Sequence, residues 1–122
     1  MTVESQLINQ IKTSGSGVGI YNLKMPDKNR VFPLIVYQRV TSPVSYTVDA
    51  VYNHSDIQFQ FTCWGESAID AKALAQKVFT SLSMFKTDPI WRTYIDGRLD
   101  RYETETGLCS VIVEVTCRAE EF

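Results

Sequence analysis

The strongest constraint in the sequence is the strict alternation of apolar and polar residues in DIQFQFTCWG, residues 56–65. A period of two residues is that of a β-strand with one buried face. The segment LCSVIVEVTCRAE, residues 108–120, alternates in the same way and is interrupted only by Ile112. The chain is therefore expected to fold around a sheet with one apolar and one polar face. The apolar set is Ile57, Phe59, Phe61, Cys63, Cys109, Val111, Val113, Val115 and Cys117.

The segment ESAIDAKALAQKVFTSLSMF, residues 66–85, follows the first of these strands and has the three- and four-residue spacing of a helix. Ser67 and Asp70 stand in a capping-box relation at its start. An apolar stripe on one side predicts that this helix packs on the sheet. The stripe consists of Ala68, Ala71, Ala75, Val78, Leu82 and Phe85, with Leu74 beside it.

The first part of the chain has weaker signals. Leu7, Ile8 and Ile11 predict a short amphipathic helix over residues 3–12, with Thr2 as its cap. Residues 13–31 have the composition of a loop, and Gly15 is the expected C-cap of the helix. FPLIVYQRV, residues 32–40, is rich in β-branched and aromatic residues and predicts a strand with Pro33 at its start or on an edge. SYTVDAVYN, residues 45–53, is a possible hairpin partner.

Two turns are expected near the C-terminus. Asp96 and Gly97 lie between two alternating segments of WRTYIDGRLDRYE, a pattern typical of a two-residue hairpin turn. YETETG, residues 102–107, predicts a second turn that Gly107 closes. The complete pattern predicts one α+β domain over residues 1–122. Its sheet is mostly antiparallel, with one long helix on one face and a short N-terminal helix.

Composition excludes several classes of protein. The net charge is −2 with both signs interspersed, which does not give the basic field of a non-specific nucleic-acid binder. No apolar run approaches the roughly 20 residues of a membrane span, and MTVESQLINQ has no signal-peptide pattern, so a cytoplasmic protein is expected. Three cysteines without a CxxC spacing and one histidine predict no metal site. They are better explained as small buried apolar residues.

Other motifs that could carry chemistry have simpler explanations. TSGSGVG, residues 13–19, resembles a phosphate loop, but it follows a helix and lacks the Lys-Ser/Thr of a P-loop, which favours a plain connector. His54 lies in a polar turn beside Ser55 and Asp56, and three adjacent residues do not converge as a catalytic set. Glu103 and Glu105 could pair as acids but fall in a solvated turn. No cofactor and no catalytic residue are expected.

Trp64 gives information about partners. It falls on the polar face of its strand with Gln58 and Gln60, where an aromatic ring is either covered by a loop or left for a partner. A sheet face with Gln, Thr, Trp and Tyr side chains is typical of a subunit interface.

The order of these segments resembles that of the small tail terminator, or tail completion, proteins of long-tailed bacteriophages. In that family a Pro-apolar-apolar-Val-Tyr-Gln stretch precedes a strand with Gln between apolar residues. An Ala-rich helix and a tyrosine-acid-turn-Gly-Leu segment follow, and lead into the last strand. Four segments match: residues 33–38, 58–64, 71–82 and 102–108. The glycine-rich stretch after the first helix and Cys109 depart from the family pattern.

The resemblance implies a non-enzymatic virion protein, assembled in the host cytoplasm. It would form a ring, commonly a hexamer, at the head-proximal end of the tail tube. Such a ring ends tube polymerisation and joins the tail to the head completion or connector protein. Genomic DNA would pass through the lumen without specific binding. The expected partner contacts are in the loop, on the polar sheet face and in the last turn, namely Gly15, Gly17, Gly19, Tyr21, Gln58, Gln60, Trp64, Glu103 and Glu105.

Two alternatives stay open. A head-tail adaptor or a tail tube protein has the same small size and also forms rings, and a tube protein differs by polymerising into long stacks. A small-molecule-binding or enzymatic α+β domain would need a concave pocket with converging polar groups, and the sequence offers no such set.

Overall fold

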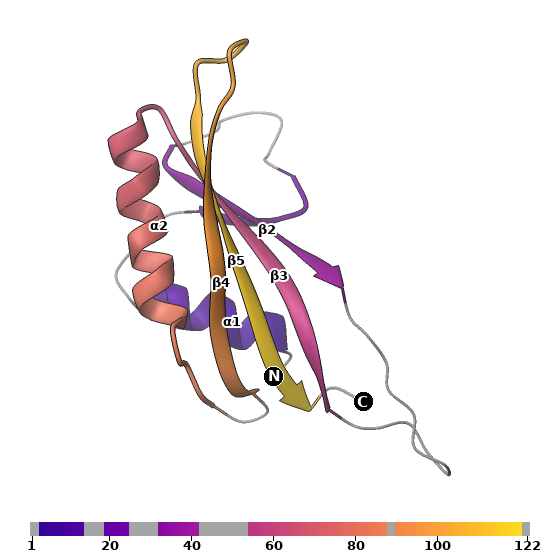
Figure 1. The fold of residues 1–122 in the computed structure, drawn as a ribbon. Helices are drawn as coiled ribbons and strands as arrows, with labels where there is room; N and C mark the ends of the chain where they lie inside the picture. Colours follow the sequence, from indigo (N-terminus) through magenta and orange to yellow (C-terminus); the bar gives the residue numbers. More distant parts are fainter. Residues whose placement is uncertain (1–2, 14–18, 25–31, 42–53, 88–89, 121–122) are drawn as a thin grey trace.

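The computed structural model describes residues 3–13, 19–24, 32–41, 54–87 and 90–120. The described elements form one five-stranded sheet with two helices on the same face (Figure 1). In chain order they are α1 (Val3–Thr13), β1 (Gly19–Asn22), β2 (Leu34–Thr41), β3 (His54–Gly65), α2 (Ala68–Leu82), β4 (Ile90–Tyr102) and β5 (Cys109–Glu120).

The strands lie in the order β1-β2-β3-β5-β4. β1 runs parallel to β2, and the other pairs of described strands are antiparallel. The predicted α+β class, with a mostly antiparallel sheet and its helices on one face, is confirmed. The chain returns from β3 to β5 through α2 and β4, so the two strongly alternating segments become neighbours in the middle of the sheet.

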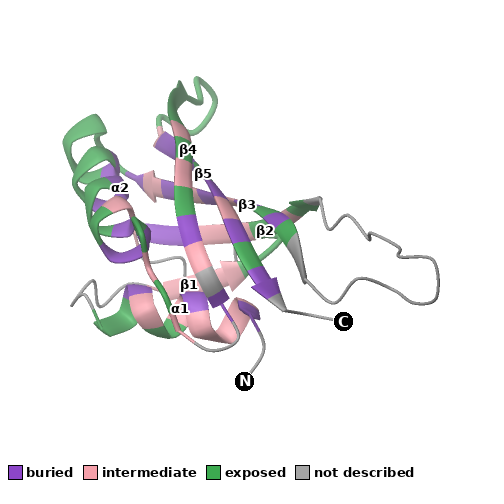
Figure 2. Ribbon diagram, turned by 60° about the horizontal axis from the view of Figure 1, so that its bottom comes forward, coloured by how far each residue is buried: buried purple, intermediate pink, exposed green. Residues whose placement is uncertain are grey.

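The alternating residues of β3 and β5 form the centre of the core, as predicted. Phe59 lies opposite Val115 and Phe61 opposite Val113, and all four side chains are buried beneath the helices. The rings of Phe59 and Phe61 are 6.2 Å apart between centroids. Burying a phenylalanine side chain contributes about 1.5–3 kcal/mol. Figure 2 shows the resulting alternation of buried and exposed positions along the strands.

α2 begins where the sequence predicts. The hydroxyl of Ser67 accepts a hydrogen bond from the N–H of Asp70 at 3.3 Å, which satisfies one of the free donors of the first turn. The helix ends at Leu82, three residues before the expected end, because Met84 has a left-handed φ of 57°. The buried stripe is Ala71, Leu74, Ala75, Val78, Ser81 and Leu82.

One member of the predicted stripe is wrong. Ala68 is exposed, because its side of the first turn lines a groove with Tyr102 and Cys109, while Ala71 in the same turn faces the core. Phe85, beyond the end of the helix, is half-buried and packs against the core.

α1 is confirmed, with Leu7 and Ile11 fully buried. Polar contacts also attach it to the rest of the molecule, among them a pair between Glu4 and Arg39 of β2 at 2.9 Å and a hydrogen bond that Gln10 donates to the carbonyl of Ser81 at 3.1 Å. The predicted caps Thr2 and Gly15 lie outside the described residues.

The predicted hairpin turn at Asp96 and Gly97 is wrong. Both residues lie inside β4, where the register against β5 shifts between Ile95 and Gly97, as in a β-bulge. The hairpin is made by the second predicted turn instead. The N–H of Glu103 donates a hydrogen bond to the carbonyl of Leu108, and the N–H of Gly107 donates one to the carbonyl of Glu103. Gly107 has a positive φ of 72°. A β5 of 12 residues needs a partner of similar length, which a turn in the middle of β4 would not supply.

Two further predictions are corrected. The stretch expected as a loop over residues 13–31 contains β1, because its backbone hydrogen bonds pair with β2. His54 was expected in a turn and is instead the first residue of β3, opposite Glu120. Pro33 directly precedes β2, as predicted. The possible hairpin partner over residues 45–53 lies outside the described part of the chain. Neither described helix is long and apolar enough to cross a bilayer.

Candidate functional site

The sheet face opposite α1 and α2 is the candidate site, and we call it the open face. Its side chains are the residues of β2, β3, β5 and β4 that alternate with the core positions. No described helix covers this face (Figure 1). The exposed members are Gln38, Val40, Asp56, Gln58, Tyr94, Asp96, Leu99, Arg101, Glu114 and Arg118.

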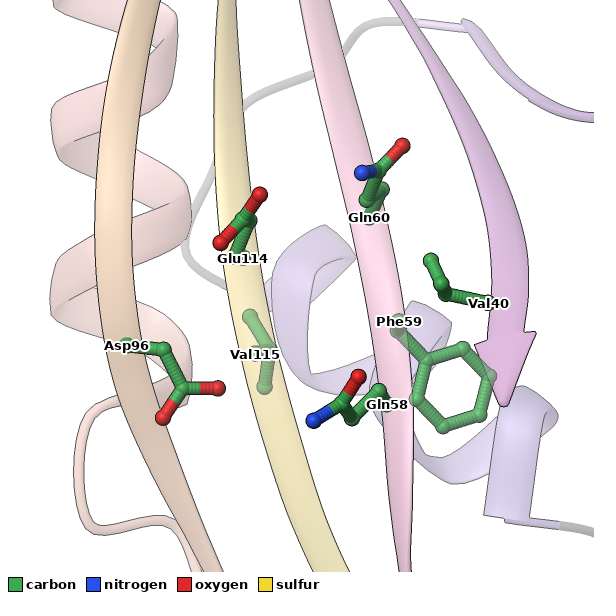
Figure 3. A pocket seen from close by; sticks show the side chains of 7 residues that line it. All are labelled: Val40, Gln58, Phe59, Gln60, Asp96, Glu114 and Val115. Atoms are coloured by element: carbon green, nitrogen blue, oxygen red, sulfur yellow. The ribbon is translucent and has the colours of Figure 1, made fainter. Parts of the chain in front are cut away.

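A hollow lies in the middle of the open face. One cross-strand row runs Gln38, Gln60, Glu114 and Gly97, and Gly97 contributes no side chain to it. The side-chain amide of Gln38 donates to that of Gln60 at 3.0 Å. Figure 3 shows the carboxylates of Asp96 and Glu114 and the amide of Gln58 around this hollow. The hollow is acidic, and it is too shallow to enclose a small molecule.

The bulge in β4 positions one of these acids. The extra residue that it introduces turns Asp96 toward β5, where its carboxylate accepts a hydrogen bond from the hydroxyl of Thr116. The carboxylate of Glu114 has no hydrogen bond or ion pair to any described residue. Glu114 is therefore an exposed negative charge in the middle of an otherwise polar, uncharged row.

An ion pair joins β3 and β5 at the end of the open face where β3 begins and β5 ends. Arg118 of β5 donates two hydrogen bonds to the carboxylate of Asp56 on β3, at 2.9 and 3.3 Å. Because both groups are about half exposed, the pair contributes little to stability. It helps to fix the positions of these two charges.

The opposite end of the open face, where β3 ends and β2 begins, is more apolar. Trp64 of β3 is half-buried and lies opposite Leu34, which is fully buried. Tyr21 of β1 lies at the level of Val36, one strand farther toward the edge. The hydroxyl of Tyr21 lies over Gly19, so closely that a Cβ at that position would be 2.5 Å from it.

The hairpin turn between β4 and β5 projects beyond the body of the sheet (Figure 1). Glu103 and Glu105 are exposed in it, as are the residues between them. The pattern identified this turn, and the two acids do not converge on a common site.

The predicted contact residues therefore fall into separate groups. Tyr21, Gln58, Gln60 and Trp64 share the open face, while Glu103 and Glu105 lie at the tip of the hairpin. Gly19 lies in β1 at the edge of the sheet, and Gly15 and Gly17 are outside the described residues.

Four exposed residues of the open face, Tyr94, Asp96, Leu99 and Glu114, are not among the contact residues predicted from the sequence. The alternation of β5 is the signal that could have identified Glu114. The position of Asp96 depends on the bulge, which the sequence does not indicate.

The helical side of the molecule carries a second set of polar contacts, which connect α2 to β4. The ammonium of Lys72 is 3.7 Å from the carboxylate of Asp100. Arg98 donates to the side chain of Gln76 at 3.1 Å and lies over the ring of Phe79 at 4.9 Å. A groove of about 330 Å³ continues from here to the first turn of α2, where Ala68, Tyr102 and Cys109 line it.

The described residues contain no group of three or more His, Cys, Asp or Glu that could hold a metal ion. Burial raises the pKa of the Cys63 thiol to about 12, so this residue is a protonated core side chain at neutral pH. Cys117 is buried and Cys109 half-buried, and none of the three cysteines forms a disulfide bond.

No protein-family model and no curated protein matches this sequence. Among solved structures, the fold is similar to that of a chain in the virion of a native gene transfer agent particle. The TM-score is 0.69 over 98% of this chain and 96% of that chain, with 11% sequence identity. At this identity the likeness shows a shared fold, since one fold serves many functions.

Proposed function

We propose that the chain is a non-enzymatic structural protein of a phage-like virion. One observation carries this proposal: the fold matches a chain of a gene transfer agent virion over nearly the whole length of both proteins. The resemblance of the sequence segments to tail terminator proteins agrees with it.

The finer proposal is a ring of subunits, a hexamer, that caps the head-proximal end of the tail tube. The ring ends tube polymerisation and presents a surface to the head completion or connector protein. The open face would take part in the contact between subunits through Gln58, Gln60 and Trp64. The hairpin turn with Glu103 and Glu105 would reach the neighbouring rings, because loops on a rigid sheet extend farthest. Gly19 and Tyr21 would contribute from the edge strand β1.

The charge of the chain fits passage of DNA through such a ring. A net charge of −2 gives no broad attraction for the phosphate backbone. DNA would slide through the lumen without being held.

The test is polymerisation of tail tube protein in the presence of the purified chain. A terminator shortens the tubes and remains at one end of each, as seen by negative-stain imaging. Tubes of unchanged length would reject the terminator role. Replacing Trp64 together with residues 103–107 should abolish capping, and undisturbed capping by that variant would reject these contacts.

A head-tail adaptor or a tube protein is the second candidate, since both form rings of similar subunits. Long tubes formed by this chain alone would favour a tube protein. A small-molecule-binding domain has less support, because the hollow on the open face is shallow and its polar groups do not enclose a volume.

A further inference from the structure

We infer that the outward side of α2 in one copy of the chain docks on the open face of a second copy, with Lys77 against the acidic hollow beside Glu114. The inference rests on the proposed function, because it names the contact through which the ring would close. The occupant of the open face is thus another copy of this chain.

Charge is the first argument. Lys77 is exposed on α2, and its ammonium has no partner among the described residues. Glu114 is exposed in the hollow, likewise without a described partner, and Asp96 adds a second acid nearby. The two surfaces therefore present opposite unpaired charges on opposite sides of the same molecule.

The heights of these groups along the strands agree. Gln76 contacts Arg98, and Arg98 lies opposite Val113, so this turn of α2 is level with the residue before Glu114. Lys77 follows Gln76 in the helix. A second copy, displaced perpendicular to the sheet without sliding along the strands, brings its Lys77 to the height of Glu114.

The lateral positions agree as well. α2 packs chiefly over β5 and β3, the two strands that carry Glu114, Gln58 and Gln60 on their other face. The helix of a neighbouring copy, turned only about an axis parallel to the strands so that the heights are kept and a ring can close, would thus cross the hollow and not the edge of the sheet.

Exposed apolar residues flank the charges on both surfaces. On the helical side, Ile69 is 80% and Met84 55% exposed, above and below Lys77. On the open face, Leu99 is 54% and Tyr94 42% exposed, above and below the hollow. The N–H of Met84 bonds the carbonyl of Thr93, which places Met84 at the level of Tyr94. An apolar-charged-apolar order is thus repeated in the same direction on both sides.

The two surfaces are different, so the contact is heterologous, and repetition by rotation closes a ring. A helix of 15 residues is about 22 Å long and about 10 Å wide, or roughly 220 Å², so α2 forms one part of a contact whose standard size is ~800 Å² per partner.

Charge reversal tests the contact. Lys77→Glu and Glu114→Lys are made separately, mixed in equal amounts, and combined in one chain, and the size of each sample is measured by light scattering. Each single variant should assemble at least tenfold more weakly than the wild type, because like charges then meet. The mixture and the double variant should recover assembly, because opposite charges meet again at every contact. Lys86→Glu, a charge reversal beyond the end of α2, is the control and should assemble like the wild type.

Unchanged assembly of both single variants would reject this contact and leave the ring proposal standing. Failure of both the mixture and the double variant to recover, with thermal unfolding like that of the wild type, would also reject it. A wild-type chain that stays monomeric contradicts the inference, since the contact involves copies of this chain alone. The tube-capping assay would then still judge the proposed function separately.

Discussion

Gly97 of β4 lies directly opposite Glu114 of β5, so no side chain stands across the strand pair from that carboxylate. A Cβ built on Gly97 would meet no heavy atom within 4 Å, and the residue does not need a positive φ. The glycine is therefore not required for the fold of the subunit. Because Gly97 has no side chain, it leaves room on the open face for a side chain of a partner.

Gly97→Thr should separate folding from assembly. A β-branched residue suits a strand, so the free energy of unfolding should stay the same or rise by up to about 1 kcal/mol. The new side chain would stand directly opposite Glu114 and hinder the approach of Lys77, so assembly should weaken at least tenfold. Urea denaturation and light scattering measure the two effects. Assembly like that of the wild type would show that the hollow is not part of a contact.

Gly65→Ala, in contrast, should lower the stability of the subunit. The added Cβ would lie 2.8 Å from the backbone nitrogen of Ala71 and 3.2 Å from the carbonyl oxygen of Ser67, both in the first turn of α2. Because these are backbone atoms, the turn must shift, and we expect a loss of about 1–3 kcal/mol in the free energy of unfolding. Gly97→Ala is the matched control. Equal stabilities of the two variants in urea would contradict the packing described here.

The elements predicted best are those whose pattern is set by burial. β3, β5 and α2 were recognised because their apolar residues repeat at two or at three to four residues, and those residues do form the core. The Asp96-Gly97 turn failed because a local turn preference competed with pairing along the whole of β5, and the longer ladder prevailed. β1 was missed because a strand of four residues at a parallel edge has too few positions to show a period.

Thr93→Val should destabilise the end of α2. The buried hydroxyl of Thr93 donates to the carbonyl of Leu82 and accepts from the N–H of Phe85 at 3.0 Å. Valine has nearly the same shape but makes neither bond, while the N–H of Phe85 keeps its 3.2 Å bond to the carbonyl of Leu82, so a loss of about 0.5–1.5 kcal/mol is expected. Thr93→Ser retains the hydroxyl and should therefore keep part of the stability that the valine variant loses. A valine variant as stable as the wild type would show that these bonds do not hold the helix end.

Stability should fall in alkaline solution, partly through Cys63. Burial raises the pKa of its thiol from 9.0 to about 12, so the unfolded chain loses this proton at lower pH than the folded chain does. The contribution is fully present below pH 9 and is lost as the pH rises from about 9 toward 12, by about 1.4 kcal/mol per pH unit.

Tyr37 acts in the same direction, because burial and then the charge of Glu4 raise its pKa. Urea denaturation of the wild type and of Cys63→Ala at pH 8 and pH 10 isolates the cysteine. The stability that the variant loses through poorer packing is the same at both pH values. Only the change in the free energy of unfolding between pH 8 and pH 10 is therefore compared. Identical slopes would contradict an ionisable buried thiol at this position.

The candidate site was predictable in part. Gln58, Gln60 and Trp64 were placed on the polar face by the alternation of β3, and the structure confirms that they share it. The same alternation places Glu114 on this face, but nothing in the sequence indicates that a glycine stands opposite it. The hollow arises from the register between β4 and β5, which is a property of the folded chain.

The mass of the purified protein in solution, measured by light scattering and followed by negative-stain imaging of the same fractions, tests the central claim most directly. The account predicts a closed ring of six 13.9 kDa subunits, about 83 kDa, of uniform thickness. Long tubes of the chain alone would contradict it and indicate a tube protein. A stable dimer of about 28 kDa would contradict it as well, because two copies joined through one shared patch leave no free surface from which a ring could grow.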